Sequence, residues 1–164
     1  MNYNDFYQKI SKPFRQNNSL LMLLKILYYI IPAITAIIYL YIIINTYITK
    51  GWTACAKVLV IPFFTLVLVT FFRKIVNARR PYSRDNISPL IARVKEGESF
   101  PSRHTASLGI IAMAGLYCNI WLGILLWCMT IIQGFVRIIC GVHYPRDIFS
   151  GIAVAVLAGL LFFI

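Results

Sequence analysis

Long apolar stretches separated by short polar segments are the dominant pattern of this chain. Several approach or exceed the length needed to cross the hydrocarbon core of a bilayer, which is ~30 Å thick. They cover about residues 20–48, 58–72, 105–118, 120–136 and 148–164. We therefore predict five transmembrane helices. The first stretch is long for one helix and too short for two, so we expect it to tilt or to project beyond the bilayer.

The segment before the first apolar stretch, residues 1–18, has a helical pattern of its own. Apolar residues recur at three- and four-residue steps among basic ones, at Tyr3, Phe6, Ile10 and Phe14. This spacing favours a short amphipathic helix that lies in the membrane interface and ends near Pro13. A disordered tail is the alternative interpretation.

Two further features of the pattern concern helix starts and helix packing. In the polar loop 82–100, Ser88-Pro89 is typical of a helix start, so an interfacial half-helix is expected there. In the last apolar stretch, Gly151, Ala155 and Gly159 repeat every four residues. Small residues at that spacing let helices approach closely, which predicts a packing face.

Composition agrees with a membrane location. The chain has 164 residues, of which 60% are hydrophobic and only 13% charged, about half the charge of an average soluble domain. We expect residues 1–164 to form a single all-α integral membrane domain, a bundle of about five transmembrane helices. The net charge of +11 fits a membrane protein with an anion site, and without a nucleic-acid motif it does not indicate nucleic-acid binding.

Three polar clusters lie between residues 73 and 147, each at the edge of an apolar stretch. They are Arg73-x6-Arg80-Pro81, then Pro101-Ser102-Arg103-His104, then Arg137-x5-His143-x3-Asp147. With five spans, the ends of the helices alternate between the two sides of the membrane. All three clusters then emerge on one side, which predicts that they form a single site.

These residue types suit a phosphate group. Arginines supply permanent positive charge for the phosphate oxygens, and Ser102 lies at a predicted helix N-terminus, which favours an anion. His143 is the candidate nucleophile, because Asp147 can fix the tautomer that leaves one ring nitrogen free. Helix capping is the alternative role for Ser102 and Asp147. Basic residues beside membrane helices also serve to snorkel or to set topology.

Over about residues 70–164, the order and spacing of the clusters resemble the type 2 phosphatidic acid phosphatase family. The family pattern is Lys-x6-Arg-Pro, Pro-Ser-Gly-His and Ser-Arg-x5-His-x3-Asp. This chain departs from it at three positions, with Arg73 for lysine, Arg103 for glycine and Val136 for serine. Strict spacing selects Arg73 for the lysine position, although the neighbouring Lys74 is also available. Arg103 is a candidate contact for a second phosphate.

The resemblance implies an enzyme that hydrolyses a lipid phosphate or diphosphate without a metal or other cofactor. It implies a phosphohistidine at His143 oriented by Asp147, with His104 protonating the leaving oxygen and later activating water. Arg73, Arg80, Ser102, Arg103 and Arg137 are the implied phosphate contacts. The two histidines and five carboxylates of the chain form no metal-binding pattern.

Undecaprenyl diphosphate is the expected substrate, since the chain is similar to small bacterial phosphatases of that lipid. Phosphatidylglycerophosphate and phosphatidate remain alternatives, as does transfer of the phosphoryl group to another lipid. A small anion-binding membrane protein is the non-enzymatic alternative.

The distribution of charge and the resemblance disagree about orientation. Fourteen of the 16 lysines and arginines lie on the side of the three clusters, and only Lys50 and Lys57 lie on the other. Taken alone, the positive-inside rule places the site in the cytoplasm. Following the resemblance, we expect a site that faces outward from the bacterial cytoplasmic membrane.

Overall fold

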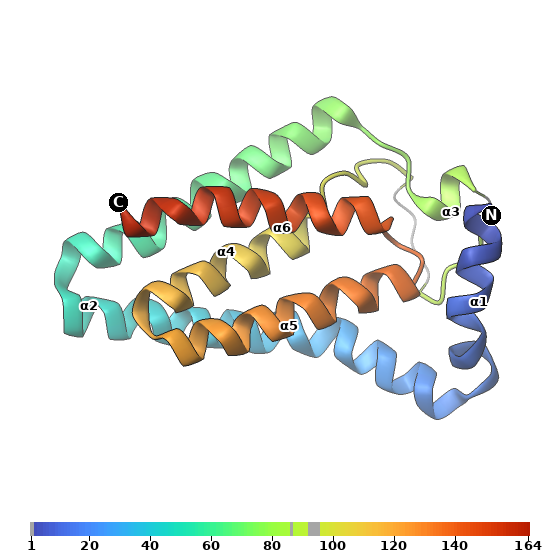
Figure 1. Cartoon of the computed structure of the whole chain (residues 1–164), viewed down its shortest axis with the longest axis horizontal. Coiled ribbons are helices and arrows are strands. Elements are labelled where there is room, and N and C mark those ends of the chain that lie inside the picture. The colour runs from blue at the N-terminus through green and yellow to red at the C-terminus, as the bar shows by residue number, and fades with distance from the viewer. Residues whose placement is uncertain (1, 86, 92–95) are drawn as a thin grey trace.

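The computed structural model describes residues 2–85, 87–91 and 96–164, and in that part of the chain every regular element is helical. The fold is an all-α integral membrane bundle (Figure 1). Its α-helices are α1 (Tyr3–Gln16), α2 (Asn18–Val76), α3 (Pro81–Arg84), α4 (Arg103–Cys118), α5 (Ile120–Ile139) and α6 (Pro145–Gly159), and a 3₁₀ turn, Leu160–Phe163, follows α6.

Helix α2 contains the first two predicted spans, joined at a sharp kink. The kink lies at Gly51, whose φ of 78° and ψ of −175° are not helical. Only glycine adopts this conformation readily, because it lacks a Cβ. Residues 18–50 and 52–76 therefore form two arms that meet at Gly51 and diverge towards the end of the bundle where α1 lies (Figure 1). The Tyr39 hydroxyl donates to the carbonyl oxygen of Val58 at 2.9 Å and ties the arms together near the kink.

Among the described residues, three helical stretches are long and apolar enough to cross a membrane by length and composition: Asn18–Arg84, Ile120–Ile139 and Pro145–Phe163. The predicted third span corresponds to α4, which has only 16 residues. Helix α4 packs against α2, α5 and α6, and most of its residues are buried. The two arms of α2 together with α4, α5 and α6 give the five helical segments expected from the sequence.

Small residues bring α6 against α4, as predicted. A Cβ atom added to Gly151 would lie 2.8 Å from the carbonyl oxygen of Ser102, and one added to Gly159 would lie 2.4 Å from Met113 Cγ. Ala155 is fully buried between them. The contact at Gly151 places the first turn of α4 directly beside the first turns of α6.

Helix α1 lies across the end of the bundle, beside α3 (Figure 1). The expected N-terminal helix is therefore confirmed, but its predicted end near Pro13 was wrong. Pro13 lies inside α1, which continues to Gln16. Pro13 has no N–H and so removes one backbone hydrogen bond, but the three residues after it keep helical geometry.

The half-helix expected at Ser88-Pro89 does not start there, and residues 92–95 lie outside the described residues. Other segments bind the backbone groups that a helix would use. The carbonyl oxygen of Ser88 accepts hydrogen bonds from Tyr7 and Arg15. The Leu90 N–H donates to the carbonyl oxygen of Cys140 at 3.1 Å.

Candidate active site

The third cluster is shaped by the connection between α5 and α6. Arg137 lies in the last turn of α5, and Asp147 is the third residue of α6. Between them the chain reverses at Gly141, whose φ of 74° falls in the left-handed region that favours glycine. This reversal returns His143 to the end of the bundle, where its side chain is only 2% exposed.

One carboxylate oxygen organises this connection. Oδ2 of Asp147 lies 3.3 Å from Nδ1 of His143 and accepts a hydrogen bond from the Tyr144 N–H at 3.0 Å. It also accepts from the Ser99 hydroxyl at 2.5 Å. A carboxylate accepts only, so Nδ1 of His143 carries the proton and Nε2 keeps its lone pair. Asp147 therefore caps α6 and orients His143 at once.

The surroundings of His143 keep its ring neutral. Burial lowers the pKa of His143 from 6.5 to about 4, and the positive charges of Arg80 and Arg137 act in the same direction. The hydrogen bond to Asp147 opposes this shift but does not overcome it. A neutral imidazole with one free nitrogen is the nucleophilic form.

The three arginines are each held in place near this histidine. Arg73 Nη1 donates to the carbonyl oxygen of Pro101 at 2.5 Å. Arg80 Nε donates to the carbonyl oxygen of Gly97 at 3.1 Å. Arg137 Nη1 donates to the Tyr28 hydroxyl at 3.1 Å, and its guanidinium lies 4.5 Å from the centre of that ring. Guanidinium groups fixed in this way form a preorganised positive environment for an anion.

The neighbours Arg73 and Lys74 point in different directions. Arg73 is buried, at 5% exposure, and lies in range of the charges of Arg80 and Arg103. Lys74 is exposed. The arginine that the spacing selected is therefore the one that faces the other clusters.

The second cluster opens α4. Ser102 is fully buried and caps the helix, and its Oγ accepts from the Thr105 hydroxyl at 3.0 Å. Its backbone N–H donates to the carbonyl oxygen of Asp147 at 2.9 Å, which joins the second cluster to the third. His104 is half-buried in the first turn of α4, and Arg103 is exposed.

Two residues that support the site, Ser99 and Tyr28, were not predicted from the sequence. Ser99 is fully buried, and its hydroxyl lies 3.5 Å from His143 Nδ1 as well as bonding to Asp147. Tyr28 belongs to the first arm of α2, more than one hundred residues before Arg137. Both contacts join segments distant in sequence, and neither residue stands in a periodic or spaced motif. Among the described residues, no group of three His, Cys, Asp or Glu is placed to hold a metal ion.

The fold and the site together define a helical membrane protein in which three arginines and an oriented histidine meet at one end of the bundle. The family model described as the PAP2 superfamily matches residues 35–164, and the chain belongs to this family.

Two curated proteins illustrate the relationship. Undecaprenyl-diphosphatase BcrC of Bacillus subtilis is 37% identical over 84 residues, which cover 51% of this chain and 43% of that protein. Lipid A 4'-phosphatase of Bacteroides thetaiotaomicron is 33% identical over 117 residues, which cover 66% of this chain and 51% of that protein. The chain thus spans about half the length of the curated relatives it matches.

Two solved structures share the fold. Aquifex aeolicus LpxE has a TM-score of 0.76 at 20% identity, and the match covers 99% of this chain and 96% of that one. A transmembrane PAP2-type phosphatidylglycerolphosphate phosphatase from Bacillus subtilis has a TM-score of 0.72 at 16% identity. That match covers 96% of this chain and 83% of the other.

Proposed function

We propose that the protein is a membrane phosphatase that hydrolyses a lipid phosphate or diphosphate, with undecaprenyl diphosphate as its substrate. The observation that carries the proposal is the buried pair of His143 and Asp147, 3.3 Å apart, with the positive charges of Arg80 and Arg137 acting on the histidine. A dry site with fixed cations is what the transition state of phosphoryl transfer requires.

The proposed reaction has two steps. Nε2 of His143 attacks the phosphorus, the bond from phosphorus to the leaving oxygen breaks, and His104 gives that oxygen a proton. His104 then takes a proton from water, whose oxygen attacks the phosphohistidine and releases inorganic phosphate. Arg73, Arg80 and Arg137 bind the phosphoryl oxygens in both steps, and the capped N-terminus of α4 at Ser102 adds backbone dipoles.

An apolar groove supports a lipid substrate. It lies between the second arm of α2 and α6, has a volume of about 380 Å³, and is lined by Phe72, Phe100, Pro101 and Leu157 among others. Pro101 is also the residue whose carbonyl oxygen accepts from Arg73. A hydrocarbon chain in this groove would therefore end beside Arg73.

The identity of the lipid is supported by the relative BcrC, whose name gives undecaprenyl diphosphate as its substrate. The exposed Arg103 is proposed to contact the second phosphate of that substrate. Phosphate release should be measured in detergent with undecaprenyl diphosphate, phosphatidylglycerophosphate and phosphatidate. Each assay should be repeated with a chelator. The proposal expects the highest kcat/KM for the diphosphate lipid and no effect of the chelator, and loss of activity with the chelator would refute the metal-free mechanism.

Replacing Arg73 tests the cationic part of the site. Arg73→Ala should lower kcat/KM about 10²–10³-fold, the usual effect of removing one group that stabilises transition-state charge. Arg73→Lys should retain much of the activity, because it keeps the charge. Lys74→Ala is the matched control, since Lys74 is exposed and should matter little. A larger effect at Lys74 than at Arg73 would reassign the phosphate contact.

Replacing Ser99 tests the orientation of His143. A hydrogen bond to a charged group contributes about 1.5–3 kcal/mol, so Ser99→Ala should lower kcat about 10- to 100-fold. KM should change little, because Ser99 bonds to Asp147 and acts on His143 through it. Ser107→Ala, a half-buried serine on α4, is the control and should behave as the unmodified protein. A rise in KM with unchanged kcat would contradict a positioning role.

The site is proposed to face outward from the bacterial cytoplasmic membrane. A single cysteine introduced at the exposed Glu96, in a variant without the four native cysteines, tests this orientation near residue 95. An impermeant thiol reagent should label it in intact cells. Labelling that requires opened cells would place the site in the cytoplasm, as the excess of basic residues on that side predicts.

A further inference from the structure

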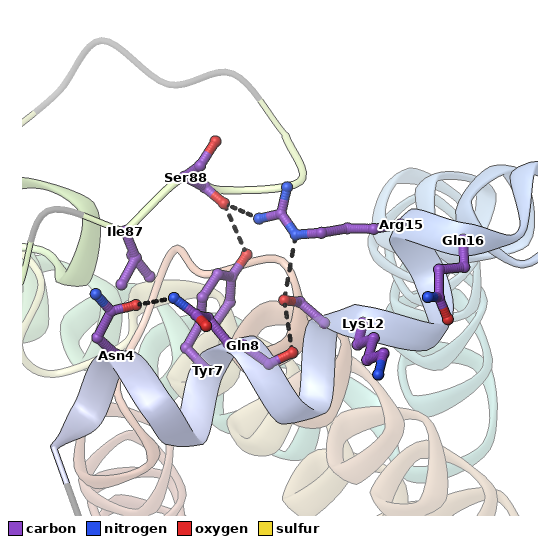
Figure 2. Close-up of a pocket in the computed structure, with 9 residues that line it drawn as sticks. Asn4, Tyr7, Gln8, Lys12, Arg15, Gln16, Ile87 and Ser88 are labelled. Carbon is purple, nitrogen blue, oxygen red and sulfur yellow. Dashed lines mark hydrogen bonds between the residues drawn. The ribbon is translucent and has the colours of Figure 1, made fainter.

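A polar pocket is lined by α1 and by the neighbouring segment at Ile87 and Ser88 (Figure 2). Its volume is about 540 Å³, within the range of small-molecule sites. Two cationic side chains, Lys12 and Arg15, line it together with amide and hydroxyl groups, and none of the described residues that line it is acidic. No residue of the three clusters lines it, so it is separate from the candidate active site.

Two adjacent rows of side chains on α1 form one wall of the pocket. Tyr7, Ser11 and Arg15 make the inner row, and Figure 2 shows the Tyr7 hydroxyl and the Arg15 guanidinium both bonded to the carbonyl oxygen of Ser88. Arg15 Nε also donates to the Ser11 hydroxyl at 3.3 Å. These bonds fix the guanidinium at the pocket without neutralising its charge.

The outer row repeats every four residues along α1. It consists of Asn4, Gln8, Lys12 and Gln16, all of which line the pocket. The Gln8 amide nitrogen donates to the Asn4 side-chain oxygen at 3.1 Å. Lys12 makes no ion pair with any described residue, and its long flexible stem lets the ammonium group move to a bound anion.

We propose that this pocket binds the phosphate headgroup of an anionic phospholipid. Guanidinium and ammonium groups surrounded by neutral donors suit a phosphodiester anion. The source of that anion is the bilayer, because α1 is an amphipathic helix that lies across one end of the bundle (Figure 1), as helices in the membrane interface do. A headgroup bound in this pocket would have its phosphate beside α1 and its chains among those of the surrounding lipids.

The same helix contacts the connection that carries His143. The Tyr7 ring lies against Gly141, where an added Cβ would come within 2.7 Å of the Tyr7 hydroxyl oxygen. The rings of Tyr3 and Tyr144 have their centres 4.7 Å apart. A headgroup that stabilises docked α1 therefore also stabilises the position of His143, so an anionic bilayer should raise the activity. That consequence rests on the proposed function, whereas headgroup binding does not.

Lipid retention by the full-length protein in detergent tests the binding. Native mass spectrometry would compare phosphatidylglycerol, phosphatidylcholine and inorganic phosphate. Lys12→Gln should weaken phosphatidylglycerol binding about two- to fivefold, since exposed ion pairs contribute up to about 1 kcal/mol. The double variant Lys12→Gln/Arg15→Gln should weaken it at least about tenfold. The candidate active site is common to all variants, so differences between them report on the pocket.

Lys9→Gln is the matched control, because Lys9 carries the same charge on α1 and does not line the pocket. It should change phosphatidylglycerol binding less than twofold. Equal losses at Lys9 and Lys12 would show nonspecific attraction and overturn the proposal. If inorganic phosphate bound in the pocket and phosphatidylglycerol did not, the proposal that the anion comes from a lipid headgroup would be overturned. Thermal unfolding of each variant distinguishes a loss of binding affinity from a loss of the docked position of α1. Because no turnover is measured, the result is independent of phosphatase activity.

Discussion

Replacing His143 with alanine should abolish phosphate release, with a loss of at least about 10⁴-fold in kcat. Removing a nucleophile eliminates the covalent pathway and leaves only binding and electrostatic stabilisation. No acid-labile phosphoenzyme should form when the variant is mixed with radiolabelled substrate. Substantial remaining turnover would mean that another group attacks phosphorus.

A second variant separates chemistry from folding. His143→Asn keeps a donor near the position of Nδ1, so it can still bond to Asp147, but it has no ring nitrogen for attack. Asp147 Oδ2 also keeps the Ser99 hydroxyl and the Tyr144 N–H in both variants. Thermal unfolding of both should therefore stay close to that of the unmodified protein. A phosphoenzyme in His143→Asn would contradict the assignment directly.

The pH dependence of the first step follows from the burial of His143. Its pKa is lowered from 6.5 to about 4, so the neutral, reactive form is fully present above 6.5. It is lost only as the pH falls through about 4. The rate of phosphoenzyme formation should therefore show no loss due to His143 between pH 6.5 and about 5. A fall in the rate of phosphoenzyme formation with a midpoint near pH 6.5 that is seen in every other variant as well would contradict this prediction. It would mean that His143 itself titrates at its ordinary pKa and is not desolvated.

Replacing His104 with alanine should slow turnover of the lipid substrate ~10²–10⁴-fold, the usual contribution of a general acid or base. The first step should recover on an activated aryl phosphate, whose leaving oxygen does not need a proton. Rapid-quench measurement of phosphoenzyme on the two substrates checks this, because His143 is still present to attack. The second step should stay slow on both, since His104 also activates water.

The outcome that argues against this role is an equal defect in the first step on both substrates. His104 would then bind phosphate without donating a proton. Ser107→Ala is a suitable control, because Ser107 is a half-buried residue one turn further along α4 and should not affect the leaving-group dependence.

Much of the architecture followed from the sequence, because apolar length predicts membrane helices well. The convergence of the clusters also followed, since alternating spans put Arg80, His104 and Asp147 at the same end. The kink at Gly51 was harder to predict, because a single glycine replaces the polar loop that usually separates two spans. The continuation of α1 past Pro13 was not predicted either, because a proline is normally interpreted as the end of a helix.

The supporting contacts of the site could not be predicted in the same way. Ser99 lies in a polar loop and reaches Asp147 only after α4 and α6 pack together, a contact that no periodicity encodes. The hydroxyl of Tyr28 meets Arg137 across a hundred residues of chain. Such pairs depend on the three-dimensional arrangement of helices, which a hydrophobic pattern specifies only in outline.

Because the kink in α2 lies at Gly51, the backbone angles of this glycine set the direction of the whole second arm. About 22 helical residues separate Gly51 from Arg73, roughly 33 Å at the rise of an α-helix. A rotation of only about 5° at Gly51 would move the end of that arm near Arg73 by roughly 3 Å, about the length of one hydrogen bond. No heavy atom lies within 4 Å of the position that a Cβ would take at Gly51. The position of the Arg73 guanidinium at one face of the membrane thus depends on φ and ψ of Gly51, a residue without a side chain, at the other face.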